Sequence, residues 1–281
     1  MSRLTEWLAE IEKQGYHGAN ARARLCQDIV LEAISKGRLR RNVTIKGGVV
    51  MRSLTGDVRR ATQDMDIDFI RYSLADDSIQ RFIQDLNVFD DFHIAIAGAI
   101  EPLRHQDYHG KYVNIRIYDT EGTIINSKID FGVHKDLTIQ QEEYCFDVCM
   151  DEEGASLLMN SQEQMLTEKL RSLLKFGPLS TRFKDIFDLC YLVNHIESSR
   201  LDHCLHHYIF DDDSMRENTY ADIVKRLEST FKNRRYQSRI KTSRKNWLGI
   251  PETAAFQKIL EFFQNLLRKS KRPAEAFCYG C

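Results

Sequence analysis

The stretch RATQDMDIDF, residues 60–69, places an aspartate at every second position, Asp64, Asp66 and Asp68, with hydrophobic residues between them. Alternate side chains of an extended strand point to opposite faces, so the stretch predicts a strand with one apolar face and one carboxylate face. Like charges at this spacing repel one another unless a cation lies among them. A solvated edge strand explains one or two such acids. Three acids favour a site for a hard cation such as Mg²⁺ or Ca²⁺.

The segments around this strand combine β and helical patterns. Apolar residues recur at helical spacing over 3–13 and 19–36, and NVTIKGG (42–48) predicts a short strand that runs into paired glycines. After the acidic stretch, an amphipathic helix is expected near 77–86. Three strand-like runs follow it, FHIAIAGAI (92–100), YVNIRIYD (112–119) and TIINSKIDFGV (123–133). These patterns predict an α+β fold with a mixed β-sheet core and flanking helices.

The period becomes helical from Asn160 onward. SQEQMLTEKLRSLLKF (161–176), TRFKDIFDLCYLVNHI (181–196) and PETAAFQKILEFFQNLLRKS (251–270) each predict a helix. We therefore expect two domains, a sheet-bearing domain over residues 1–155 and a helical C-terminal domain over residues 156–281.

Composition excludes several classes of protein. The chain has 281 residues with a hydrophobic content of 42% and a formal net charge of -1, which predicts a globular fold without global attraction to nucleic acid or membrane. Its N-terminus lacks a signal-peptide pattern, and no apolar run approaches the roughly 20 residues that span a bilayer. Seven scattered cysteines fit a reducing compartment, so we expect a cytoplasmic protein with no membrane partner. The terminal pair Cys278 and Cys281 is interpreted as part of a functionless tail.

The paired glycines Gly47 and Gly48 lie between a predicted strand and a predicted helix. Glycines allow close approach of a phosphate, and a helix N-terminus presents free N–H groups to it. The strand aspartates could hold Mg²⁺ against the same phosphates, and Asp130, in another strand, could supply a third carboxylate. Such a metal site could activate a hydroxyl and stabilise a leaving pyrophosphate.

These residues resemble a known family. KGGVVMR followed by RATQDMDIDF is similar to the first motif of the nucleotidyltransferase superfamily. Together with KIDFG, SQEQMLTEKLRSLL and RFKDIFDL, it resembles the AbiEii/AbiGii group of toxin-type nucleotidyltransferases over about residues 46–189. The resemblance implies transfer of a nucleoside monophosphate from a nucleoside triphosphate to an acceptor, with Mg²⁺ or Mn²⁺ as the cofactor. It further implies a toxin of a toxin-antitoxin (abortive infection) pair with RNA, such as the tRNA 3′ end, as its acceptor and a cognate antitoxin protein as a partner.

The resemblance also implies roles for single residues. The metals fall to Asp64 and Asp66, or to Asp66 and Asp68 in a shifted register, and Asp130 matches the third acid. Lys169 and Asp185 match active-site residues of the helical blocks, so the implied catalytic set is Asp64, Asp66, Asp130, Lys169 and Asp185.

The resemblance also implies contacts to the phosphates. They are Gly47 and Gly48 of the glycine turn, Arg52 of the helix after it, and Lys169 of the helical half. Val49 departs from the family, because a Ser or Thr commonly follows the glycine pair and supplies a hydroxyl to the phosphates. This departure leaves a nucleotide-binding module that has lost catalysis as one alternative function. A modifier of a small molecule or of a protein on the same fold is the other alternative.

Two features of the helical half have both a functional and a plain interpretation. Asp185 could orient Lys169 near phosphates, or it could form an ordinary i, i+3 ion pair with Arg182. The segment 225–245 holds nine basic residues and one acid, with Phe231 and Tyr236 among them and Trp247 close behind. We predict that Arg234, Arg235, Arg239 and Lys241 contact nucleic acid while the aromatic residues stack on bases; a solvated surface helix is the alternative.

Overall fold

The computed structural model describes residues 2–103 and 110–271. The chain folds as two compact units, Met1–Ser161 and Gln162–Cys281. The boundary expected near residue 155 falls inside a strand, Asp151–Met159, that completes the sheet of the first unit. Cys278 and Cys281 lie outside the described residues.

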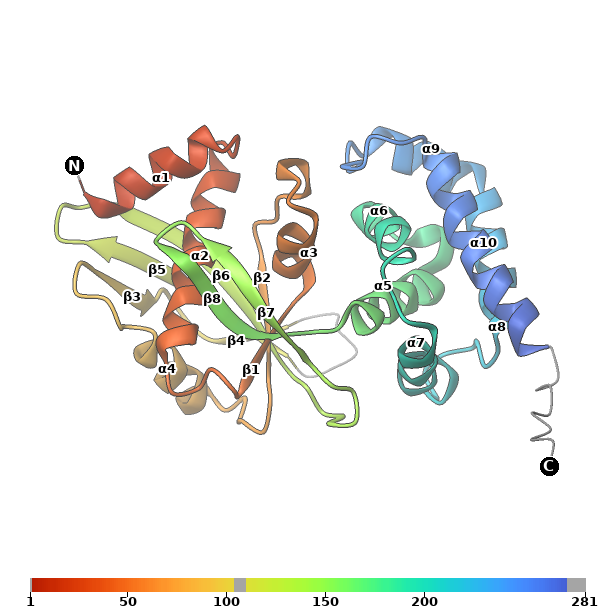
Figure 1. The fold of residues 1–281 in the computed structure, drawn as a ribbon, viewed down its shortest axis with the longest axis horizontal. Helices are drawn as coiled ribbons and strands as arrows, with labels where there is room; N and C mark the ends of the chain where they lie inside the picture. The colour runs from red at the N-terminus through yellow and green to blue at the C-terminus, as the bar shows by residue number, and fades with distance from the viewer. Residues whose placement is uncertain (1, 104–109, 272–281) are drawn as a thin grey trace, which may run out of the picture. The chain divides into compact units, whose positions relative to one another are not determined.

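The first unit is built on one mixed sheet (Figure 1). Its eight strands in the described residues are β1 (Val43–Lys46), β2 (Met65–Phe69), β3 (Phe92–Ile96), β4 (Glu101–Pro102), β5 (Lys111–Asp119), β6 (Ile124–Val133), β7 (Glu142–Val148) and β8 (Asp151–Met159). The strand order is β3-β5-β6-β2-β1-β8-β7, and β4 pairs with β5. β2 is antiparallel to β1 and parallel to β6, so it lies at the centre of the sheet.

Four α-helices accompany the sheet in the described part of this unit. They are α1 (Arg3–Lys13), α2 (Ala19–Lys36), α3 (Gly47–Thr55) and α4 (Asp76–Asp85), and a short 3-10 helix, η1 (Val58–Arg60), follows α3. Figure 1 shows α1 and α2 lying across the sheet. Phe82 of α4 packs edge-on against the rings of Phe69 in β2 and Phe131 in β6, which stack on each other. This apolar face of the sheet is therefore the core of the unit.

Residue alternation separates the core face of the sheet from the opposite face. In β5, Val113, Ile115 and Ile117 are buried, whereas Asn114 and Arg116 between them are exposed. The same alternation in β2 buries the hydrophobic residues of the 60–69 stretch and sends its aspartates to the opposite face, as the sequence predicts.

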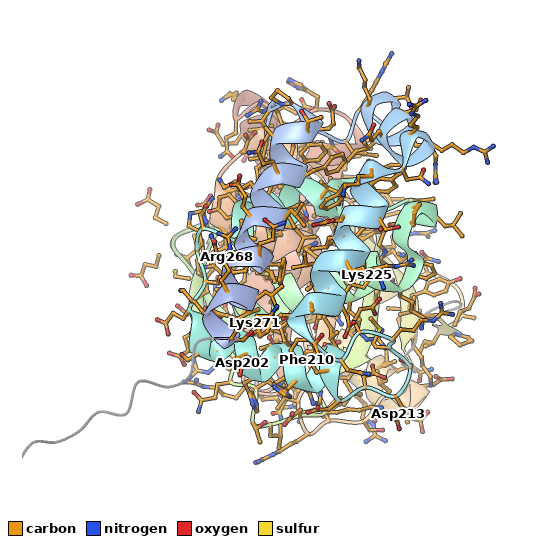
Figure 2. The ribbon with its side chains drawn as sticks, turned by 90° about the vertical axis from the view of Figure 1, so that its right-hand side faces the viewer. Asp202, Phe210, Asp213, Lys225, Arg268 and Lys271 are labelled. Carbon is orange, nitrogen blue, oxygen red and sulfur yellow. The ribbon has the colours of Figure 1, made fainter. Side chains whose placement is uncertain are left out.

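The second unit is helical throughout its described residues. Its elements are α5 (Gln162–Phe176), η2 (Gly177–Leu179), α6 (Phe183–Leu192), α7 (Ser198–Leu205), the π-helix η3 (His206–Phe210), α8 (Tyr220–Lys232), α9 (Arg234–Thr242) and α10 (Glu252–Ser270). Figure 2 shows α8, which carries Lys225, beside α10, which carries Arg268. Phe231 of α8 and Phe256 of α10 stack with ring centroids 4.4 Å apart, so aromatic packing joins these helices.

The α+β fold class expected from the sequence, a mixed sheet with flanking helices followed by a helical C-terminal part, is confirmed. Within residues 2–103 and 110–271, no helix is both long enough and apolar enough to cross a membrane.

Candidate active site

Three neighbouring strands bring charged side chains to the face of the sheet opposite the core. In the register of the sheet, Asp66 of β2 pairs with Lys46 of β1 on one side and with Asp130 of β6 on the other. Paired residues of adjacent strands point to the same face, so these side chains are neighbours. Asp64 lies immediately before β2, and Asp68 lies two residues beyond Asp66. We call Asp64, Asp66, Asp68 and Asp130 the acidic face.

Two lysines lie among these acids. Lys128 Nζ lies 3.4 Å from Asp64 Oδ1 and 3.1 Å from Asp130 Oδ1. Lys46 Nζ lies 2.7 Å from Asp68 Oδ1, and the Asp68 residue is only 5% exposed. Asp68 therefore has a buried counter-charge in its own unit, whereas Asp64 is exposed. Which register faces a metal, Asp64 and Asp66 or Asp66 and Asp68, stays a prediction.

The ionised forms of two acids are disfavoured on this face. Burial raises the pKa of Asp66; Lys46 lowers it, and the charges of Asp130, Asp64 and Asp68 raise it further. Burial also raises the pKa of Asp130, against the lowering effects of Lys128 and Lys46. A bound cation would relieve this repulsion because it favours every ionised carboxylate near it.

The acidic face has the ligand chemistry that a metal needs, but its side chains are not arranged around a metal position. Carboxylate oxygens are the ligands that Mg²⁺ prefers, and three acids come from adjacent positions. In the part of the chain that the structure describes, however, no group of three or more Asp, Glu, His or Cys side chains is arranged to hold a metal ion. Lys128 lies between Asp64 and Asp130, where it supplies the positive charge that a cation would supply.

The glycine turn lies against this face. Gly47 begins α3 with a φ of 64°, and a Cβ at this position would overlap the Asp66 carboxylate. A Cβ on Gly48 would lie 2.7 Å from Thr62 Cβ. Only glycine therefore lets the first turn of α3 pack so close to β2. No side chain of the described residues caps this helix N-terminus, so its first amide groups are open beside the acids.

Arg52 and Val49, the other two residues of α3 singled out in the sequence, lie in the core. Arg52 is 1% exposed, and its Nη1 lies 3.4 Å from Oδ1 of the buried Asp28. Burial lowers the pKa of Arg52 to about 10, against the raising effect of Asp28. Val49 is fully buried. Arg52 thus has a structural ion-pair partner in this unit, and its contact with phosphate stays a prediction.

In the second unit, Lys169 of α5 lies between two acids of α6. Its Nζ lies 2.8 Å from Asp185 Oδ1 and 2.8 Å from Asp188 Oδ2. Asp188 is fully buried and also accepts a hydrogen bond from Trp247 Nε1 at 3.0 Å. Arg182 contacts Asp185 more distantly, at 3.9 Å. Asp185 therefore contacts both Lys169 and Arg182, and Lys169 is the closer partner. That Asp185 orients Lys169 near phosphates stays a prediction.

Helix α9 packs its aromatic side chain, Tyr236, against the rings of Phe183 in α6 and Phe256 in α10. Tyr236 is fully buried, and its hydroxyl has no hydrogen-bond partner among the described residues. Burial, with a smaller effect from the charge of Asp185, raises the pKa of Tyr236. Phe231 and Trp247 are buried as well, so the prediction that these three aromatic residues stack on bases is wrong. Their rings fill the core of the second unit.

The four basic residues predicted to contact nucleic acid differ in exposure. Arg234, Arg235 and Lys241 are exposed on α9. Arg239 is half-buried, with its guanidinium 5.2 Å from the centroid of the Phe183 ring. Their contact with nucleic acid stays a prediction.

Sequence reasoning did not single out Lys46 and Lys128 as members of the site. Lys46 directly precedes the glycine pair, and Lys128 lies two residues before Asp130 on the same face of β6. That spacing is the signal that could have identified Lys128. Asp188 lies three residues after Asp185 on the same face of α6, and this spacing is the signal that could have identified it. Trp247 gave no such signal, because only packing brings its indole to Asp188.

Comparison with known proteins adds the following. A family model described as "Nucleotidyl transferase AbiEii toxin, Type IV TA system" matches residues 29–261. A comparison with curated protein sequences gave no match. The matched range includes the glycine turn, the acidic face, Lys169 and its acids, and the basic helix α9.

Proposed function

Because the chain belongs to the AbiEii nucleotidyl transferase toxin family, we propose that it transfers a nucleoside monophosphate from a nucleoside triphosphate to an RNA acceptor. The observation that carries the proposal is the register of the sheet, which pairs Asp66 with Asp130 and brings Gly47 against the Asp66 carboxylate. A metal-bound triphosphate requires carboxylates for its metal and N–H groups for its phosphates, and this point of the fold has both.

Asp64, Asp66 and Asp130 are the residues that would hold Mg²⁺ or Mn²⁺. When bound, the cation supplies charge for the triphosphate oxygens and for the leaving pyrophosphate. The amides of Gly47 and Gly48 would bind phosphate oxygens at the start of α3. Lys46, held by the buried Asp68, adds a fixed positive charge on the same face. In this proposal Lys128 moves away from Asp64 and Asp130 when the metal binds.

The reaction itself needs little covalent chemistry from the protein. The acceptor hydroxyl loses its proton and bonds to the α-phosphorus, while the bond between the α-phosphorus and the bridging oxygen breaks and pyrophosphate leaves. Catalysis then rests on positioning and charge stabilisation. Lys169 would contribute a positive charge to the phosphates, and Asp185 and Asp188 would fix the position of its ammonium group.

RNA is the proposed acceptor because exposed arginines and a lysine gather on α9 while the net charge of the whole chain is -1. Such a local basic surface supplies phosphate affinity without sequence preference. We also propose that a cognate antitoxin protein restrains the enzyme, as the type IV toxin-antitoxin description of the family suggests. A catalytically inactive nucleotide-binding module is the second candidate, favoured by Val49, which buries an apolar side chain where the family commonly has a hydroxyl.

The purified protein should be incubated with each α-labelled nucleoside triphosphate, Mg²⁺ and total cellular RNA, with Asp66→Asn as the control. We expect the wild type to label an RNA band and the Asp66→Asn variant to leave that band unlabelled. Label on a small molecule or on protein would show that the acceptor belongs to that class and is not RNA. No label with any of the four triphosphates would favour the inactive module.

A further inference from the structure

The second unit carries an exposed apolar surface at the turn after α5. Among its described residues, the exposed large hydrophobic side chains are Phe176, 49% exposed, and Leu179, 78% exposed. They flank Gly177 and Pro178 in and beside η2. About half of Phe176 therefore remains outside the core of its unit. Together with Leu179 it forms a small apolar surface that is open to a ligand.

Two arginine side chains donate hydrogen bonds to backbone carbonyl oxygens at this turn. Arg239 Nη1 of α9 donates to the Pro178 carbonyl oxygen at 3.2 Å, and Arg226 Nε of α8 donates to the Leu174 carbonyl oxygen at 3.0 Å. A Cβ on Gly177 would lie 2.5 Å from Arg226 Nη2, so the glycine lets this guanidinium lie against the turn. Positive charge is therefore fixed to the backbone on both sides of Phe176. The exposed Arg235 lies one turn of α9 before Arg239.

The position of Phe176 relative to Lys169 is fixed by helix geometry. The two residues are seven apart in α5, which places them two turns apart on the same face of the helix. With a rise of 1.5 Å per residue, their Cα atoms are separated by about 10 Å along the axis. That is the span of a few nucleotides, so a strand whose end lies at Lys169 could place a base on Phe176.

We propose that Phe176 is a stacking platform for a base of single-stranded RNA, whose phosphates are bound by Arg226, Arg235 and Arg239. This inference rests on the proposed function and specifies its acceptor as an unpaired strand. Stacking needs the open face of a base, which a duplex does not offer, and an aromatic ring beside basic side chains is the combination used for single strands. Phe176 can stack on a base because it is exposed, whereas Phe231, Tyr236 and Trp247 are buried and cannot.

The test measures binding of a fluorescein-labelled single-stranded oligoribonucleotide, by anisotropy over a range of salt concentrations. Phe176→Ala should weaken binding by roughly 5-fold to 150-fold, the effect of removing one base–aromatic stack. Its salt dependence should stay unchanged, because no phosphate contact is lost. Phe176→Trp should retain affinity, and fluorescence of the new tryptophan should be quenched by the oligoribonucleotide. Tyr118→Ala, which removes an exposed aromatic residue of the first unit, is the matched control and should bind as the wild type does.

The outcomes separate this inference from the proposed function. If the wild type binds the single strand but Phe176→Ala binds equally well, the stacking platform is refuted and RNA as acceptor stands. If the wild type binds duplex RNA of the same sequence as well as the single strand, and Phe176→Ala weakens neither, the specificity for an unpaired strand is refuted. If the wild type binds no RNA, both the stacking platform and RNA as the acceptor are refuted. An effect of Phe176→Ala on triphosphate binding instead of RNA binding would assign the ring to the nucleotide substrate and overturn the inference.

Discussion

Replacing Lys169 with methionine should destabilise the second unit and abolish transfer for two different reasons. The substitution keeps the apolar length of the side chain and removes the ammonium group that lies 2.8 Å from both Asp185 and Asp188. Asp188 is fully buried, so the substitution removes a cation that lies directly against a buried carboxylate. Breaking a buried ion pair in this way costs about 3–5 kcal/mol.

The structure places the expected loss at the lower end of that range. Trp247 Nε1 still donates to Asp188 Oδ1, and Asp185 retains some solvent contact and the more distant Arg182. We therefore expect the free energy of unfolding of the second unit to fall by about 3 kcal/mol. Adding Asp188→Asn removes the buried charge that has lost its lysine partner, so the double variant should recover about 2 kcal/mol.

Urea unfolding followed by tryptophan fluorescence is the assay. Trp247 is buried beside Asp188 and reports on the second unit, and Trp7→Phe removes the tryptophan of the first unit from the signal. Transfer should be absent in Lys169→Met and should stay absent in the double variant, because stability returns without the positive charge. Lys169→Arg should recover little activity, since a planar fork places its charge differently from an ammonium. A loss below about 1 kcal/mol in Lys169→Met, or a double variant no more stable than the single one, would refute the buried ion pair.

The acidic face and the basic helix support further predictions. Because burial and neighbouring acids raise the pKa of Asp66, its folded form binds a proton more tightly than the unfolded chain does, and ionisation destabilises the fold as pH rises from 3.8 through the folded pKa. Asp66→Asn should therefore raise the urea midpoint at neutral pH in metal-free buffer and have little effect at lower pH; an unchanged or lower midpoint at neutral pH would contradict this. Mg²⁺ with a triphosphate should raise the melting temperature of the wild type by mass action and much less that of Asp64→Asn, as scanning fluorimetry can measure; equal shifts would exclude Asp64 as a ligand. Arg234→Gln with Arg235→Gln should reduce the salt slope of RNA binding by about 0.7 per lost contact and leave triphosphate binding unchanged. An unchanged slope would mean that these arginines are solvated surface residues that do not contact RNA.

The sequence was informative where local pattern and function coincide. Alternation over residues 60–69 predicts both the strand β2 and its carboxylate face, and the spacing of α5 predicts the helix that carries Lys169. β8 was not predicted, because DEEG at its start has the composition of a turn, although it pairs in parallel with β1 beside the glycine turn. Its place in the sheet depends on a partner strand far away in the sequence, and such pairing has no local signal.

The charged partners of the site show the same limit. Lys46 and Lys128 reach the acidic face through the register of β1, β2 and β6, which is a tertiary property. In 225–245 the basic residues are conspicuous in the sequence, but the side of α9 on which Tyr236 lies is decided by packing. Helical spacing alone could not tell a ring that stacks on RNA from one that fills the core, whereas the exposure of Phe176 in the structure separates the two.

The central claim is that the acidic face catalyses nucleotidyl transfer. Its most direct test compares the same triphosphate labelled at the α-phosphorus and at the γ-phosphorus, with Mg²⁺, RNA and either the wild type or Asp66→Asn. Nucleotidyl transfer predicts that the α-label becomes attached to RNA, that the γ-label appears in pyrophosphate, and that Asp66→Asn does neither. Attachment of the γ-label to RNA, or equal labelling by Asp66→Asn, would contradict the account.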